Sequence, residues 1–122
     1  MSPRKVQFIS LEEDDKDLVV SFALDDTQGD IESLILLRTL FYEEYLDEDE
    51  RGVKVSLENN EFEEEDRNVL VDIQIANDEI LIRSTFREYR LDISSIKKED
   101  VEGMVRLLKK QNYDNRFTMR IA

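Results

Sequence analysis

Alternation of apolar and polar positions predicts most of the secondary structure. In residues 17–24, Leu18, Val20, Phe22 and Leu24 fall on one side of an extended chain, which is typical of a half-buried strand. The same alternation predicts strands at 5–10, 53–58, 69–75, 80–82, 89–93 and 116–121. The connections between 69 and 93 are short, so we expect those three strands to form an antiparallel meander.

Residues 31–38 fit two structures. The turn residues at 25–30 favour a hairpin that leads into a strand. However, Ile31, Leu34 and Ile35 also fit a helix that begins after Asp30. We favour the strand, followed by a short helix over 40–48. Residues 59–66 have Phe62 as their one apolar side chain, which predicts a solvated loop.

A helix is predicted over residues 97–111. Val101, Met104, Val105 and Leu108 fall on one face of it, and Leu107 flanks them. Acidic residues stand in the first turn and lysines in the last, as the helix dipole favours. We therefore expect a single α+β domain over 1–122: a mostly antiparallel sheet of about six to eight strands, with this helix packed on one face.

The composition removes most catalytic chemistry. The chain has no Cys and no His, which excludes the usual zinc ligands, thiol nucleophiles and imidazole acid/base catalysis. Its three glycines are scattered and form no phosphate-binding loop. Residues 47–58 match an EF-hand calcium loop at four positions, but Arg51 stands where a ligand is needed. We therefore expect no enzymatic activity, no cofactor and no bound metal.

Nothing in the sequence indicates a membrane protein. No stretch approaches the roughly 18 apolar residues that span a bilayer. The N-terminal residues 1–5 lead into an alternating segment and not into the apolar core of a signal peptide. We expect a cytoplasmic protein that does not bind membranes.

The acidic excess is regional and predicts a basic partner. Asp and Glu outnumber Lys and Arg by 21 to 6 in residues 1–66, whereas the counts are 9 and 11 in residues 67–122. Arg83 and Arg90 lie close in sequence to Phe86 and Tyr89, a combination that can bind nucleic acid. The net charge of −13 repels phosphate, so we expect no nucleic-acid binding and a basic protein partner instead.

The acidic segments 12–17, 43–50 and 61–66 are the candidate contact surface. Tyr42, Tyr45 and Phe62 lie within or beside them, where they could serve as aromatic anchors or belong to the core. Solubility alone is the alternative explanation of the acidic segments. The predicted partner-binding residues are Glu43, Glu44, Asp47, Glu48, Asp49, Glu63, Glu64 and Glu65.

Crowding of these carboxylates has a consequence for their pKa values. Mutual repulsion in the folded chain raises carboxyl pKa values, and we expect this for segments 43–50 and 61–66. Pairing with lysines or arginines of the same chain is the opposing case, in which the pKa values fall.

The chain resembles a known family in its layout. An apolar run ending in a polar residue (34–38), an acidic segment ending in Gly (47–52) and a short strand (53–58) resemble the immunity proteins of bacterial polymorphic toxin systems. This resemblance implies a non-enzymatic α+β protein that binds and silences a cognate toxin. It assigns no individual binding residue.

A different function class remains open. A small structural or regulatory domain could act by self-association or by docking in a larger assembly. Its contacts would be edge strands at the two ends of the chain, residues 5–10 and 116–121, which could pair across the two-fold axis of a homodimer.

Overall fold

The computed structural model describes residues 3–25, 31–58 and 68–121. In chain order the elements are β1 (Arg4–Glu13), β2 (Asp17–Asp25), β3 (Ile31–Thr39), the 3₁₀ turns η1 (Glu43–Tyr45) and η2 (Glu48–Glu50), β4 (Lys54–Leu57), β5 (Leu70–Ile75), β6 (Glu79–Ser84), β7 (Glu88–Asp92), α1 (Lys98–Gln111) and β8 (Thr118–Ile121). The strands form one sheet in the order β4-β3-β2-β1-β7-β6-β5-β8. Its pairs are antiparallel except for β1 with β7 and β5 with β8. The predicted α+β fold is confirmed.

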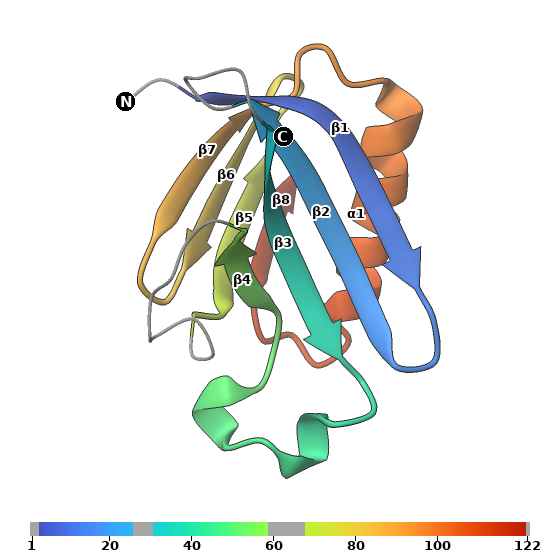
Figure 1. The fold of residues 1–122 in the computed structure, drawn as a ribbon, viewed down its shortest axis with the longest axis vertical. Coiled ribbons are helices and arrows are strands. Elements are labelled where there is room, and N and C mark those ends of the chain that lie inside the picture. Colours follow the sequence, from blue (N-terminus) through green and yellow to red (C-terminus); the bar gives the residue numbers. More distant parts are fainter. Residues whose placement is uncertain (1–2, 26–30, 59–67, 122) are drawn as a thin grey trace.

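The sheet curls until β4, at one end of the strand order, meets the start of β5 near the other end. Figure 1 shows β3 passing in front of β8, with α1 behind β1 and β2. The amide of Val55 donates to the carbonyl of Asn68 at 2.8 Å, and the amide of Leu70 donates to the carbonyl of Val53 at 2.7 Å. One apolar cluster contains buried residues from β1 to β7 and from α1. It fills the space that the curled sheet encloses.

Residues 31–39 form the strand that we favoured. β3 pairs with β2 over its whole length and with β4 along its centre. Leu34 and Leu36 are buried, whereas Ile35 between them is only half-buried. Pairing with β2 and β4 therefore supplies hydrogen-bond partners to the backbone N–H and C=O groups of β3.

The short helix predicted over 40–48 is wrong. The segment contains η1 and η2 instead, separated by extended backbone at Leu46 and Asp47. Arg51 donates from Nε to the carbonyl of Leu46 at 3.1 Å and from Nη2 to the carbonyl of Glu44 at 3.2 Å. Arg51 thus gives these two carbonyls a hydrogen-bond partner within the same segment, and the extended backbone at Leu46 and Asp47 interrupts the helix.

The predicted C-terminal helix is confirmed within one residue. α1 packs against β1 and β2, and Leu107, expected at its flank, is buried with Met104 and Leu108. A Cβ on Gly103 would lie 3.2 Å from Cδ1 of Leu11. The missing side chain therefore lets the helix approach β1 closely.

One predicted edge strand is wrong in part and the other is confirmed. β1 lies inside the strand order, but it pairs in parallel with β7 only at its start, where Arg4 and Lys5 face Leu91 and Asp92. This pairing joins strands almost ninety residues apart, so local alternation could not reveal it. β8 ends the sheet as expected.

None of the helices in the described ranges has the length and apolarity that crossing a bilayer requires.

Candidate protein-binding surface

A fully buried arginine lies at the end of β3. The alternation that buries Leu34 and Leu36 also directs Arg38 inward, and Arg38 is 0% exposed. Removing a guanidinium from water is unfavourable unless opposite charges and acceptors surround it. The surroundings of Arg38 must therefore replace water.

All five N–H donors of Arg38 have acceptors. Nε and Nη2 donate to the two carboxylate oxygens of Glu43 at 2.9 and 2.5 Å. Nη1 and Nη2 donate to the two carboxylate oxygens of Asp114 at 2.7 and 2.9 Å. Nη1 also donates to the carbonyl of Gln111 at 2.8 Å. Two bidentate carboxylates and one carbonyl thus satisfy the whole guanidinium.

The ring of Tyr113 completes what we call the Arg38 cluster: Arg38, Glu43, Gln111, Tyr113 and Asp114. The guanidinium carbon lies 4.1 Å from the ring centre, within cation–π range. Burial alone would lower the pKa of Arg38, but the hydrogen bonds to Asp114 and Glu43 outweigh it and the pKa rises. Partial burial raises the pKa of Tyr113. The cation is therefore permanent and the phenol neutral near pH 7.

The ion pairs continue from the Arg38 cluster to η2. Arg116 donates from Nε to Asp114 at 2.8 Å and from Nη2 to Glu48 at 3.0 Å. The hydrogen bond from Arg38, followed by that from Arg116, holds the pKa of Asp114 well below its usual range. The hydrogen bond to Asp114 raises the pKa of Arg116. The turn after α1 is thereby tied to both 3₁₀ turns.

Residues 40–52, which we call the projection, extend beyond the strand ends between β3 and β4 (Figure 1). Gly52 closes the projection with a φ of +110°, which side-chain-bearing residues rarely adopt. Exposed apolar side chains cover its first half: Leu40, Phe41, Tyr42 and Tyr45. The rings of Phe41 and Tyr42 contact each other edge to face, with their centres 4.8 Å apart.

The predicted contact residues separate into three groups. Glu43 is 9% exposed and bound to Arg38, so the expectation that it contributes to the outer surface is wrong. The structure places Glu44, Asp47 and Glu48 on the exposed surface of the projection. The side chain of Asp49 and all of Glu63, Glu64 and Glu65 lie outside what the structure describes.

The aromatic alternatives are resolved for two residues. Tyr42 and Tyr45 are exposed, Tyr45 by 77%, and so do not belong to the core. Phe62 lies outside the described residues.

Pairing, not crowding, describes the carboxylates at the base of the projection. Glu43 and Glu48 both bind arginines of the same chain. In the described ranges, the carboxyl groups with clearly shifted pKa values are Asp14, Asp92 and Asp114, and all three shift downward. Asp14 accepts backbone amides of Asp17 and Lys16, and Asp92 is hydrogen-bonded to Ser94. Clear pKa shifts therefore follow hydrogen bonding.

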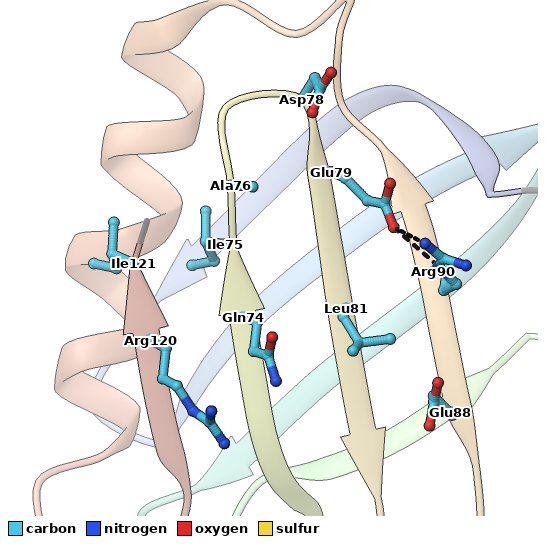
Figure 2. A pocket seen from close by; sticks show the side chains of 10 residues that line it. All are labelled: Gln74, Ile75, Ala76, Asp78, Glu79, Leu81, Glu88, Arg90, Arg120 and Ile121. Carbon is cyan, nitrogen blue, oxygen red and sulfur yellow. Dashed lines mark hydrogen bonds and ion pairs between the residues drawn. The ribbon is translucent and has the colours of Figure 1, made fainter.

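A second polar surface lies on the outer face of β5 to β8. Figure 2 shows Gln74, Leu81 and Arg90 on the side of the sheet turned away from α1. They line a shallow pocket of about 580 Å³. Arg90 pairs with Glu79 at 2.8 Å across β6 and β7. Arg120 lies 3.5 Å from the buried Asp72. These pairs join neighbouring strands, so the sheet itself explains them.

No comparison assigns a function to either surface. Comparing the chain with protein-family models, curated proteins and solved structures gives no match. Within the described ranges, no three acidic side chains converge as a metal site would require. The projection combines exposed aromatic rings, exposed carboxylates and a buried anchor. It is therefore the stronger candidate for a functional surface.

Sequence reasoning missed the Arg38 cluster, although a signal was present. Arg38 continues the inward alternation of Leu34 and Leu36, and a charge at an inward position requires a buried counter-charge. Nothing local could identify Asp114, 76 residues away, as that partner.

Proposed function

We propose that this is a cytoplasmic, non-catalytic binding protein that neutralises a basic partner, most specifically an immunity or inhibitor protein acting on a basic toxin. The projection is the proposed contact surface. Its aromatic side chains supply apolar contact area, and Glu44 and Asp47 supply a negative rim, whereas Glu48 beside them is paired with Arg51 and Arg116.

One observation carries the proposal: exposed aromatic rings stand on a segment that a buried ion-pair cluster fixes in place. Exposed contiguous apolar side chains on a small domain mark interaction sites. Rigid aromatic anchors within a charged rim are what binding hot spots use. A net charge of −13 adds long-range attraction to a basic partner.

The test is a pull-down with the wild-type protein and two matched variants. Tyr45→Ala removes the most exposed ring of the projection, whereas Phe86→Ala removes a 53% exposed ring between β6 and β7. Both side chains are mostly exposed, so each change should alter stability by less than about 0.5 kcal/mol. We expect basic proteins to be recovered from a lysate of the source organism at low salt by wild type and Phe86→Ala, and about tenfold less by Tyr45→Ala.

The immunity assignment needs a narrower experiment. Cells that express the product of a neighbouring toxin-sized reading frame should grow again when this protein is coexpressed. The Tyr45→Ala variant should restore their growth less well. Recovery of no basic protein at low salt would count against the binding function itself. Equal recovery by both variants would count against the projection as its site.

Self-association is a second candidate that one observation favours. β8 ends the sheet, and Ile121 on it is 55% exposed, so this edge could pair with a second copy. β1 is a weaker candidate for this role, because Arg4 and Lys5 already pair with Leu91 and Asp92 of β7. Light scattering decides the matter: a monomer at micromolar concentration at both low and high salt removes the homodimer.

A further inference from the structure

The exposed aromatic rings of the projection are held on a fixed backbone. Glu43, between Tyr42 and Tyr45, is fastened on both oxygens to Arg38. Arg51 binds two carbonyls within the same segment. A partner that contacts these rings therefore loses little free energy to ordering the projection.

The rings carry a negative rim. Glu44 is exposed between Tyr42 and Tyr45 in sequence, and Asp47 is exposed just beyond them. Glu48 is also exposed, but it is paired with Arg51 and Arg116. The face of an aromatic ring is itself the negative part of its quadrupole. Both kinds of group attract a cation, so charge complementarity selects a positively charged segment over an apolar or acidic one.

The shape of these groups distinguishes between the two cations that proteins offer. A guanidinium is planar and weakly hydrated, and it can stack on a ring while it donates to a carboxylate from its edge. An ammonium is a compact, strongly hydrated charge, and contact with a ring removes part of its hydration shell. Tyrosine faces beside carboxylates therefore favour arginine over lysine.

The chain itself contains one such arrangement. Arg38 has a tyrosine ring 4.1 Å from its guanidinium carbon and two carboxylates at its edges. Glu43, which binds Arg38, is flanked in sequence by Tyr42 and Glu44. These two residues expose the same pair of groups, an aromatic ring and a carboxylate, to solvent. The internal cluster thus shows that a guanidinium fits between a tyrosine ring and carboxylates in this fold.

We propose that the projection recognises an arginine-rich segment of its partner, with guanidinium groups stacking on Tyr42 and Tyr45 and donating to Glu44 and Asp47. This inference rests on the proposed function and specifies the chemistry of the partner at the same surface.

Two matched peptides test the inference. One short peptide alternates arginine with glycine, and the other has lysine at every arginine position, so their charges are equal. Each is titrated into the isotopically labelled full chain while backbone amide signals are followed by NMR and affinity by calorimetry. We expect the arginine peptide to bind about fivefold to tenfold more tightly, with the largest signal changes in residues 40–48.

Variants separate stacking from general charge attraction. Tyr42→Ala with Tyr45→Ala should reduce the arginine preference to about twofold or less, whereas Phe86→Ala should preserve it. The amide spectrum of each variant in the absence of peptide shows whether its fold is intact. If Tyr42→Ala with Tyr45→Ala is unfolded, Tyr45→Leu, which keeps apolar bulk without a π face, replaces it.

The outcomes distinguish the inference from the proposed function. Equal affinity of the two peptides at residues 40–48 overturns the arginine preference and leaves a basic-partner surface. Signal changes confined to residues 12–17, or to the face around Arg90, overturn the projection as the site. Binding that the tyrosine variants do not alter overturns the stacking and leaves charge attraction alone.

Discussion

Arginine–carboxylate pairs occur both in the Arg38 cluster and on the outer face of β5 to β8, but the two sets differ in burial. In the Arg38–Glu43 pair the side chains are 0% and 11% exposed, whereas in the Arg90–Glu79 pair they are 52% and 34% exposed. Their closest distances are similar, 2.5 and 2.8 Å. Distance alone therefore does not distinguish them.

Burial changes what an ion pair does. In water, the exposed pair gains little, because solvent and salt screen it and the side chains lose freedom. In the interior, loss of one partner leaves a charge without compensation, so the pair restricts the chain to the geometry that satisfies it. The Arg38 cluster thereby determines where the projection lies. The Arg90–Glu79 pair, in contrast, lies on β6 and β7, which backbone hydrogen bonds already hold together.

The largest expected effect comes from deleting the buried cation. Arg38→Met keeps much of the side-chain volume but leaves Glu43 unpaired and Asp114 with Arg116 alone. It should lower the free energy of unfolding by about 3–5 kcal/mol. The matched change Arg90→Met should lower it by less than about 1 kcal/mol. Urea unfolding of both variants gives the two values. Similar losses in the two variants would break the comparison.

Acid titration gives a smaller and pH-dependent effect. Because hydrogen bonds from Arg38 and Arg116 lower the pKa of Asp114, its stabilising contribution is complete above its unfolded pKa of about 3.9 and is lost as the pH falls toward the folded pKa. Asp114→Asn should therefore be less stable than wild type by about 1.5–3 kcal/mol near neutral pH. The difference should narrow below about pH 4.

Asp92→Asn is the control for this titration. The pKa of Asp92 is also lowered, but its hydrogen-bond partner is Ser94 and the carboxyl group is exposed. Its substitution should alter stability less than that of Asp114 at every pH. Urea unfolding from neutral to strongly acidic pH measures both variants. A constant difference between wild type and Asp114→Asn across that range would contradict the role of this carboxylate.

The smallest effect is expected at the outer end of the ion-pair chain. Glu48 contacts Arg116 and Arg51, but its side chain is 76% exposed. Glu48→Gln should therefore change the free energy of unfolding by less than about 1 kcal/mol, and by still less at an ionic strength near 1 M. Thermal unfolding at low and high salt measures this. If Glu48→Gln lowered the free energy of unfolding as much as Arg38→Met, exposed ion pairs would stabilise the protein as strongly as the buried ones.

Local sequence was a reliable guide where one period dominates. The inward row Leu18, Val20, Phe22 and Leu24 and the helix over 97–111 follow from side-chain alternation and helical spacing, because burial of one face enforces a single period. The acidic character of residues 40–50 is equally a property of the sequence. So is the absence of histidine and cysteine chemistry.

The tertiary structure decided what depends on distant partners. It placed β1 inside the sheet through parallel pairing with β7, and it replaced the expected helix at 40–48 with two 3₁₀ turns held by Arg38 and Arg51. It also divided the acidic residues into the buried Glu43 and the exposed Glu44, Asp47 and Glu48. Local patterns specify which face of a segment is buried, but the counter-charge for a buried arginine can come from any part of the chain that folding brings beside it.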